Sequence, residues 1–498
     1  MKKKLLCLLV FIFLLSGCSS IMGSNLVRKP TVTCLADLPG KTIGVQLGSA
    51  EDLAVSEIDD ATVIEYNSPH DAIQALIQDK LDCVVINDQA AAAFVEKDDS
   101  LRILEEAFGY EESAICIAKG NDDLTMKINE VINEIKSDGT LENIMDYYLD
   151  DEYSGERYSS SDDIDRTNGI LKVATNAEFE PYEYIEQGEY VGIDMDICRV
   201  LADRLNMELE IEDMQFASII TAVTSGKADI GVAGMAVTEE RAKRVNFTVP
   251  LYNNAKQVIV IHDGTYTMTQ TILDRLYDNF IVDDRYKSLL SGLGITLLIT
   301  LFAEIIGLAL GLLIAFVRYT HDKLNIMHIG NLISQVYLVI IRGTPSVIQL
   351  LIIYYVIFAS VSVNKVLVAT IAFGLNSAAY VAEVIRSGWN SIDNGQYEAG
   401  RSMGFNYLKT MRLFILPQAF KNIVPTLGNE FIVLLKETAI SGYIGIFDLT
   451  RAGDYIRSRT YEALLPLVTV ALIYLIIVAI MSFLVSLIER RLNKNDKQ

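Results

Sequence analysis

The sequence predicts two domains of different fold class, an α/β domain followed by an all-helical membrane domain. The chain has 498 residues, a mean hydropathy of +0.29 and a formal net charge of −22. Residues 1–287 carry a net charge of −27, whereas residues 288–498 carry +5. An acidic, water-soluble half therefore precedes an apolar, slightly basic half. This division excludes a single soluble enzyme and a pure membrane bundle, and the negative charge argues against nucleic acid as a partner.

The acidic half alternates β-branched runs with segments of helical spacing, which predicts an α/β domain with parallel sheets. Strands are expected at residues 41–46, 61–66, 82–86, 114–118, 171–175, 207–211, 229–234 and 257–261. Helices are expected at residues 71–78, 124–136, 195–206 and 217–225. Residues 151–169 are rich in Ser and Asp and lack periodicity, so we expect a linker there.

Residues 1–18 combine three lysines with an apolar run that is too short to span a membrane, which is typical of a secretory signal. The sequence Leu-Ser-Gly-Cys that ends at Cys18 resembles a bacterial lipobox, in which the cysteine is lipidated; an ordinary cleaved signal is the alternative. The four later cysteines are widely spaced, so no zinc or other metal site is expected. We expect Cys83 and Cys116 to be buried free thiols, although an even number also permits disulfides.

Three segments resemble the first half of solute-binding proteins for polar amino acids: LKVATNAEFEPYEY, YVGIDMDICRVLADRLN and SGKADIGVAGMAVTEERAKRVNFTVPLY, all within residues 170–262. Residues 30–150 resemble the second half, through ADLPGKTIGVQLGSAED, ALIQDKLDCVVINDQAAAAF and INEVINEIKSDGTLENIMDYYL. The resemblance implies a two-lobed periplasmic-binding-protein-like (type II) domain. Because the halves are inverted, we infer a circular permutation whose joint is the linker 151–169. Exchange of halves between two chains of a dimer is the alternative.

The same resemblance implies a ligand site between the lobes, in which Arg241 binds the carboxylate of an amino acid. The other implied ligand residues are Asn176, Phe179, Phe216, Ala233, Gly234 and Thr238 from one lobe, and Gln46, Ser49, Asn87 and Asp88 from the other. A solvated Arg241 and core aromatics are the alternatives. Asn176 and Asn87 stand where the family has Asp, and Ala236 where it has Thr. We therefore expect an atypical amino acid, or an ammonium group held by Asp88.

The basic half contains five apolar segments of membrane-spanning length, at residues 289–317, 344–363, 365–385, 423–446 and 464–488. They form a helical domain, 288–488, that follows a second linker at 263–287. An exported acidic half places the C-terminus in the cytoplasm. Twelve basic residues then lie inside, against four outside, which agrees with the positive-inside rule. The twelve are Arg318, Lys323, Arg342, Arg386, Arg401, Lys409, Arg412, Lys421, Arg490, Arg491, Lys494 and Lys497. The four are Lys365, Arg451, Arg457 and Arg459.

Residues 396–418 resemble the coupling loop of ABC importer permeases, two short helices that dock on the ATPase. The motif consists of Glu398-Ala399-Gly400, then Gly404, then Leu416-Pro417. Small residues allow close helix packing, Gly404 permits a tight turn and Pro417 starts a helix. An ordinary amphipathic loop is the alternative. Within the predicted spans, Glu304, Glu430, Lys436 and Glu437 mark either a solute pathway or an internal ion pair.

These features predict a transporter subunit rather than an enzyme, with no catalytic residue and no cofactor of its own. The sequence GxxxxGK[ST] is absent, so a separate ATPase subunit must use the ATP. We expect an ABC importer in a bacterial cell membrane, with its binding domain outside. Its partners are the ATPase, a second copy of the chain, membrane lipid and a small polar amino acid. An amino-acid sensor with a degenerate pocket and a ligand-gated channel are the alternatives.

Overall fold

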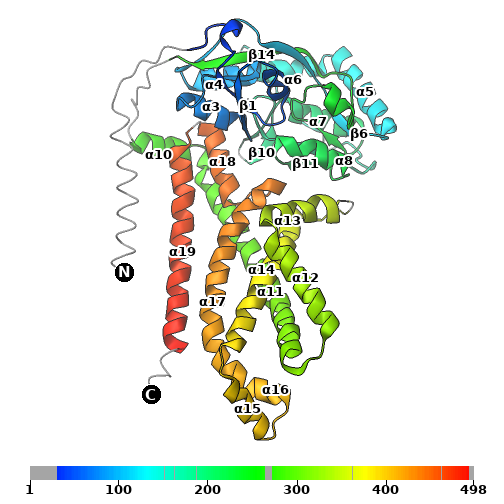
Figure 1. The fold of residues 1–498 in the computed structure, drawn as a ribbon. Helices are drawn as coiled ribbons and strands as arrows, with labels where there is room; N and C mark the ends of the chain where they lie inside the picture. Colours follow the sequence, from blue (N-terminus) through cyan, green and yellow to red (C-terminus); the bar gives the residue numbers. More distant parts are fainter. Residues whose placement is uncertain are drawn as a thin grey trace. The chain divides into compact units, whose positions relative to one another are not determined.

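The computed structural model describes residues 31–492, apart from residues 151, 162, 187, 264–271, 360, 362 and 461. The predicted signal with Cys18, and the basic residues Lys494 and Lys497, lie outside the described residues. Figure 1 shows the fold, coloured along the sequence. The chain divides into two compact units. One unit comprises residues 1–111 and 253–275, and the other comprises residues 112–252 and 276–498. We describe each unit by itself.

The first unit is built on a mixed sheet with the strand order β2-β1-β3-β14-β4, and β5 also pairs with β14. The strands are β1 (Thr42–Gln46), β2 (Thr62–Tyr66), β3 (Cys83–Asn87), β4 (Leu101–Ile103), β5 (Gly109–Ser113) and β14 (Tyr252–His262). The helices are η1 (Leu35–Asp37), α2 (Ala50–Val55), α3 (Pro69–Ile77) and α4 (Asp88–Lys97). Alternate strand residues such as Ile43, Val45, Ile259 and Ile261 are fully buried and form the core.

The soluble part of the second unit, here called the 112–252 domain, has a sheet of order β11-β7-β12-β6-β13 and a small sheet of order β10-β9-β8. The strands are β6 (Cys116–Ala118), β7 (Ile170–Thr175), β8 (Glu178–Phe179), β9 (Glu183–Glu186), β10 (Glu189–Val191), β11 (Glu208–Asp213), β12 (Ile230–Gly231) and β13 (Val245–Phe247). The helices are α5 (Asp122–Ser137), α6 (Thr140–Leu149), α7 (Ile193–Arg204), η2 (Phe216–Ser218), α8 (Ile219–Thr224) and α9 (Glu239–Ala242).

The prediction of parallel sheets is wrong, because both sheets are mixed. Strand β6 runs antiparallel to β12 and β13, and β14 runs antiparallel to β3 and β4. Strand β6, before residues 151–169, and strand β12, after them, thus run in opposite directions in the same sheet. Cys83 and Cys116 are buried and free, as predicted. Burial raises the pKa of each thiol to about 12, which keeps both protonated.

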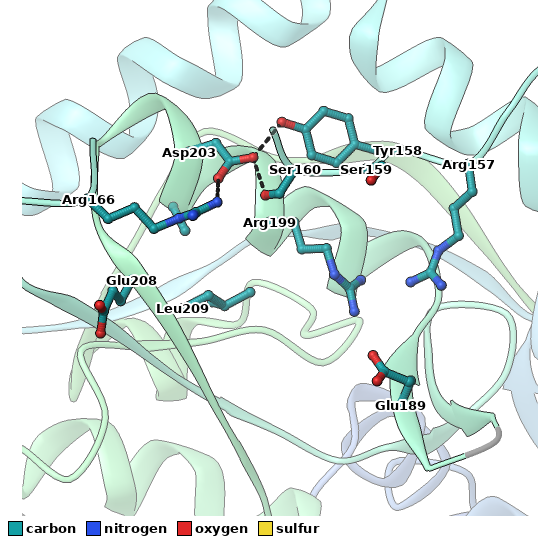
Figure 2. Close-up of a pocket in the computed structure, with 11 residues that line it drawn as sticks. Arg157, Tyr158, Ser159, Ser160, Arg166, Glu189, Arg199, Asp203, Glu208 and Leu209 are labelled. Carbon is teal, nitrogen blue, oxygen red and sulfur yellow. Dashed lines mark hydrogen bonds and ion pairs between the residues drawn. The ribbon is translucent and has the colours of Figure 1, made fainter. Parts of the chain in front are cut away.

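The described residues of the expected linker, 152–161 and 163–169, have no regular secondary structure, but ion pairs join them to α7. Arg157 contacts both oxygens of Asp196, with Nη2 2.9 Å from Oδ1 and Nε 3.0 Å from Oδ2. Asp203 accepts from Arg166 at 2.9 Å and from the Tyr158 hydroxyl at 2.9 Å (Figure 2). Both aspartates are buried, so their charges require these partners. The described residues of this segment form an ordered strap beside a cavity of about 630 Å³.

The membrane domain comprises the helices from residue 272 onward. They are α10 (Ile272–Phe280), η3 (Val282–Asp284), α11 (Tyr286–Leu324), α12 (His328–Gly343), α13 (Ser346–Ile352), η4 (Ile353–Ile357), α14 (Lys365–Asn390), α15 (Asn394–Ser402), α16 (Tyr407–Thr410), η5 (Met411–Ile415), α17 (Leu416–Glu437), η6 (Thr438–Ile444), α18 (Leu449–Thr460) and α19 (Leu464–Leu492). In the described part of the chain, Val282–Leu324, Lys365–Asn390 and Leu464–Leu492 are long and apolar enough to cross a membrane. A bent pair, His328–Gly343 with Ser346–Ile357, makes up to four.

Two of the five predicted spans have the wrong boundaries. The second was placed at 344–363, but α12 ends at Gly343 and the next helix turns by 110°. Pro345 explains the break, since it forces Thr344 into the extended conformation (φ −121°, ψ 145°). Arg342 therefore lies at the end of α12, away from the loop between α11 and α12. The fourth span begins at Leu416 instead of 423, and α17 is not among the helices that qualify by composition.

Close packing of α11 on α14 depends on glycine. A Cβ at Gly307 would lie 2.4 Å from Ser377 Oγ, one at Gly311 2.6 Å from Val381 Cγ1, and one at Gly374 2.8 Å from Ile306 Cβ. Without a hydrophobic drive between helices in lipid, small residues are what allow backbones to approach and gain dispersion energy. This pair of helices forms the rigid centre of the membrane domain.

Candidate functional site: a ligand cluster, a coupling loop and a polar membrane cluster

Arg241 is a buried cation in the 112–252 domain. Its helix α9 begins at Thr238, whose hydroxyl accepts a hydrogen bond from the Arg241 backbone N–H at 3.3 Å. The side chain is 7% exposed; its Nη1 donates to the Ala236 carbonyl at 2.6 Å, and its guanidinium lies 5.5 Å from the centroid of the Phe216 ring. The alternative of a solvated Arg241 is therefore wrong. A guanidinium is the side-chain group that can form two parallel hydrogen bonds with a carboxylate.

The loop after β12 brings Gly234 against Phe179. Gly234 has φ +52°, and a Cβ there would lie 3.4 Å from Phe179 Cε1. Its backbone N–H donates to Asp194 Oδ2 at 2.8 Å, and Ala233 beside it is buried. Phe179 stacks on Tyr182 with a centroid distance of 5.7 Å and an interplanar angle of 17°. Phe179 and Phe216 are half-buried, and each packs against a buried core cluster.

Asn176 and the buried acidic pair Glu183 and Asp194 lie next to this cluster. The Asn176 amide donates to the Met214 carbonyl at 3.0 Å and joins the ends of β7 and β11. Glu183, which the sequence reasoning missed, is 1% exposed. Burial raises the pKa of Glu183 well above its ordinary value, and the charge of Asp194 raises it further. Glu183 thus lies beside the carboxylate that fixes Gly234, in surroundings that favour its neutral form.

The four ligand residues predicted in the first unit gather at one edge of its sheet. Gln46 and Asn87 end the adjacent parallel strands β1 and β3, and α2 and α4 begin next to them. Ser49 caps α2 by accepting from the Asp52 N–H at 3.1 Å, and Asn87 caps α4 by accepting from the Gln89 N–H at 3.0 Å. Burial raises the pKa of Asp88, which lies at the first position of α4. This edge is where α/β sheets bind small ligands.

The coupling loop folds as two short helices, as predicted. Gly404 makes the turn between α15 and α16 with φ +83°. Gly400 lets the helices touch, because a Cβ there would lie 2.7 Å from Thr410 Cγ2. Glu398 and Ala399 are exposed. So are the apolar side chains of Met403, Leu408 and Leu413, at 68%, 62% and 55%. Figure 1 shows α15 and α16 at one end of the membrane domain, with α18 at the other.

Pro417 lies in the first turn of α17, as predicted for a residue that starts a helix. The residues before it are also helical, with a π-helical turn at Met411–Ile415 that leads directly into Leu416. Proline lacks an N–H donor and disturbs the α-helical ladder. A π turn shifts that ladder by one residue, which accommodates the missing donor.

Three of the ionisable residues predicted in the membrane segments lie within electrostatic reach of one another. Glu304 and Glu437 each interact with Glu430, and Arg342 interacts with Glu430 as well. Glu304 on α11 accepts a hydrogen bond from Ser377 on α14 at 3.2 Å. Lys436 is exposed, and its charge acts on Glu437, the next residue of α17. A solute pathway and an internal ion pair both remain predictions for these residues. The sequence reasoning missed Arg342 because it placed this residue in a loop.

Comparison with known proteins covers both parts of the chain. Residues 171–467 match the model of the bacterial extracellular solute-binding proteins, family 3. The arginine transport system permease protein ArtQ of Bacillus subtilis is 41% identical over 210 residues, which are 42% of this chain and 94% of that protein. The glutamine transport system permease protein GlnP of Escherichia coli is 35% identical over 207 residues, 41% of this chain and 92% of that protein. The crystal structure of an amino acid ABC transporter with histidines is 40% identical, with a TM-score of 0.40, and covers 45% of this chain and 100% of that one.

Fold, coupling loop and comparisons together define a transporter protein in which a solute-binding domain is fused to a permease, and its relatives are not enzymes. The chain belongs to the bacterial extracellular solute-binding proteins of family 3, and its C-terminal part belongs to the permeases of amino-acid ABC transporters.

Proposed function

We propose that this chain is the membrane subunit of an ABC importer that captures a polar amino acid outside the cell and passes it through a dimeric permease, driven by a separate ATPase. One observation carries the proposal: a single chain contains both a ligand cluster around Arg241 and an exposed two-helix coupling loop. The exposed apolar residues of that loop suit a protein partner. ATP hydrolysis by the ATPase subunit bound to that loop would open the path marked by Glu304, Glu430 and Glu437.

An amino acid is the ligand that best fits the cluster. Arg241 offers a fork for a carboxylate, and the half-buried rings of Phe179 and Phe216 offer apolar contact. Relatives named for arginine and glutamine transport support the amino-acid class.

We also propose a circularly permuted binding domain in a lipid-anchored chain. Strand β6 precedes the joint and β12 follows it, yet they pair within this one chain, which favours permutation over exchange between chains. The described residues of 152–169 form ion pairs with α7 of the same domain. Lipid at Cys18, a binding domain outside and a C-terminus in the cytoplasm complete the topology.

The test is uptake by the full chain and its ATPase in vesicles, with L-arginine and L-glutamine as the first probes among the common amino acids. We expect ATP-dependent accumulation, and calorimetry should show binding to the full chain. Arg241→Lys should weaken binding by about 30-fold or more, because an ammonium group cannot form the fork. No heat and no uptake with any common amino acid would overturn the proposal.

A further inference from the structure

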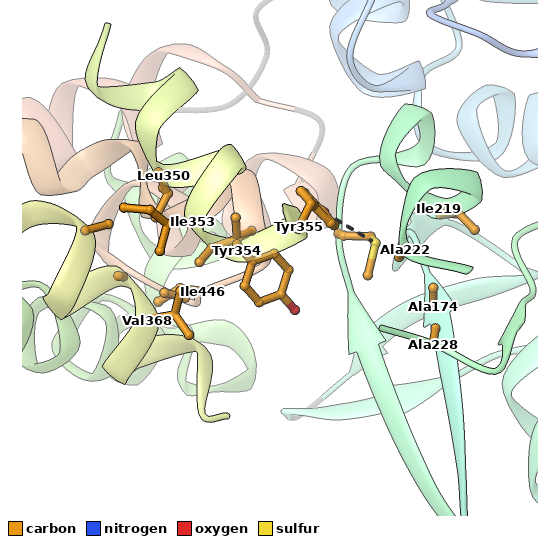
Figure 3. Close-up of a cluster of buried hydrophobic side chains, with 14 of the residues drawn as sticks. Ala174, Ile219, Ala222, Ala228, Leu350, Ile353, Tyr354, Tyr355, Val368 and Ile446 are labelled. Atoms are coloured by element: carbon orange, nitrogen blue, oxygen red, sulfur yellow. Dashed lines mark hydrogen bonds between the residues drawn. The ribbon is translucent and has the colours of Figure 1, made fainter. Parts of the chain in front are cut away.

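The 112–252 domain is fixed to the membrane domain by a buried apolar cluster. One continuous cluster contains Met214, Ile219 and Ala222 of the soluble part together with Leu350, Ile353 and Tyr354 of the membrane part (Figure 3). The Tyr355 hydroxyl lies 3.8 Å from Met214 Sδ. Burial of this kind contributes about 25 cal/mol per Å² of apolar surface removed from water. The contact therefore lies inside one compact unit of the chain.

Charged side chains surround this apolar contact and have opposite signs on its two sides. Lys365 of α14 lies 2.8 Å from Glu212, which also accepts from the Tyr354 hydroxyl at 3.0 Å. Arg459 of α18 lies 3.1 Å from Glu180. Arg451 of α18 lies 2.7 Å from Asp213 and also pairs with Glu178. The Arg451 pairs are the most enclosed, with side-chain exposures of 13% for Arg451 and 5% for Asp213.

The partners of Arg451 are parts of the two loops that carry the ligand aromatics. Asp213 ends β11, just before Phe216, and its second oxygen accepts from the Ala177 N–H at 3.0 Å. Glu178 directly precedes Phe179. A single guanidinium thus holds the loop after β7 and the loop after β11 together. Moving either loop away would leave a buried charge unpaired, which is unfavourable.

On its other side, Arg451 belongs to a helix that is packed tightly into the membrane domain. The Leu449 N–H donates to Thr296 Oγ1 of α11 at 3.1 Å. A Cβ at Gly292 would lie 2.5 Å from the Asp448 carbonyl oxygen, and one at Gly453 would lie 2.6 Å from Val470 of α19. Helix α18 cannot shift without α11 and α19. A displacement of the ligand loops therefore reaches two helices of membrane-spanning length.

We propose that Arg451 is a positioning residue that couples the ligand loops of the 112–252 domain to the outer ends of α11 and α19. This inference rests on the proposed importer function. Arg451 does not touch the ligand. It keeps residues 176–179 and α18 in one arrangement, so that occupation of the ligand site changes the conformation of the permease. Coupling of this kind is a free energy shared by two sites.

The first test needs no ligand. Hydrogen exchange of the full chain in lipid nanodiscs is measured for wild type, Arg451→Gln and Arg457→Gln. Arg457 is the matched control, because it lies on the same helix and pairs with Asp454 of that helix at 2.8 Å. We expect exchange of the Ala177 amide to rise about tenfold in Arg451→Gln and to stay within about twofold in Arg457→Gln. Unchanged protection of residues 176–179 in Arg451→Gln would overturn the proposal.

The second test measures coupling in the complex with the ATPase, with L-arginine and L-glutamine as probes. Arg451→Gln should lower the ratio of stimulated to basal ATP hydrolysis about fivefold or more, while the Kd for the probe changes less than about threefold. Arg451→Lys should recover part of the ratio. Glu178→Gln, which keeps the pair with Asp213, serves if Arg451→Gln fails to fold. An unchanged ratio, or an equal loss of ratio and affinity, would overturn the proposal. Absence of binding in wild type would instead count against the importer, and the exchange result would still stand.

Discussion

The two ends of the membrane domain differ in what covers them. At one end, α18, α13 and α14 lie against the 112–252 domain, with apolar side chains buried and charges paired. At the other end, Met403, Leu408 and Leu413 of the coupling loop are exposed. The first end is covered by residues of the chain itself. The second end exposes apolar side chains, as protein-binding surfaces do. Of these two surfaces, one is therefore buried within the chain and the other is exposed.

The largest effect should come from making the exposed end polar. The double change Met403→Ser and Leu408→Ser should weaken binding of the ATPase about 30-fold or more, because apolar anchors dominate protein interfaces. Thermal stability should stay unchanged, since both side chains are exposed. Val237→Ser is a matched control, since Val237 is 41% exposed on the 112–252 domain. Equal affinity of the double variant and wild type in a pull-down with purified ATPase would show that the loop is not the docking surface.

A smaller loss should follow from separating the two helices of the loop. In Gly400→Val the new side chain must enter the space of Thr410, where even a Cβ would lie at 2.7 Å. Overpacking of this kind costs about 1–3 kcal/mol. Ligand-stimulated ATP hydrolysis should fall about tenfold while ligand binding at the other end is retained. Loss of ligand binding in this variant would show that the effect of the substitution is not confined to the loop.

The buried acid Glu183 allows the stability of the 112–252 domain to be changed without altering the coupling loop. Its pKa is raised in the folded state, so the folded protein binds the proton more tightly than the unfolded chain does. Stability then falls as pH rises from the ordinary carboxyl range to the raised pKa, by about 1.4 kcal/mol for each tenfold fall in proton concentration. Glu183→Gln should melt at a higher temperature than wild type above that range and at the same temperature in acid. Parallel melting curves from about pH 4 to pH 9 would exclude this role.

The smallest effect is expected for the more open ion pairs of the same interface. Arg459 pairs with Glu180 at 3.1 Å and with Glu186 at 3.5 Å, and Glu186 is half exposed. Such pairs contribute about 0–1 kcal/mol. Arg459→Gln should therefore leave ATPase stimulation within about twofold of wild type. A loss as large as that of Arg451→Gln would mean that the whole charged rim, rather than Arg451, transmits the signal.

The features that could be predicted from the sequence are those that depend on residue type and on short-range periodicity. The turn at Gly404, the close contact at Gly400 and the strands of the 112–252 domain follow from residue type and periodicity. Two predictions are wrong for local reasons: Pro345 ends α12, and the order of the chain segments pairs β6 and β12 in antiparallel fashion. The Arg451 contacts could not be predicted, because Glu178 and Asp213 are distant in sequence and resemble solvated surface charges. The sequence gives one indication that Glu183 is buried, because this acid stands between Tyr182 and Tyr184.

The most direct test of the central claim is uptake at low amino-acid concentration in vesicles that contain only this chain and its ATPase. If the binding domain is a working part of the permease, ATP-dependent accumulation of the transported amino acid should occur with no separate binding protein. The uptake should saturate at the Kd measured for the full chain. Accumulation only after a separate binding protein is added, or uptake that Arg241→Lys does not weaken, would contradict the account.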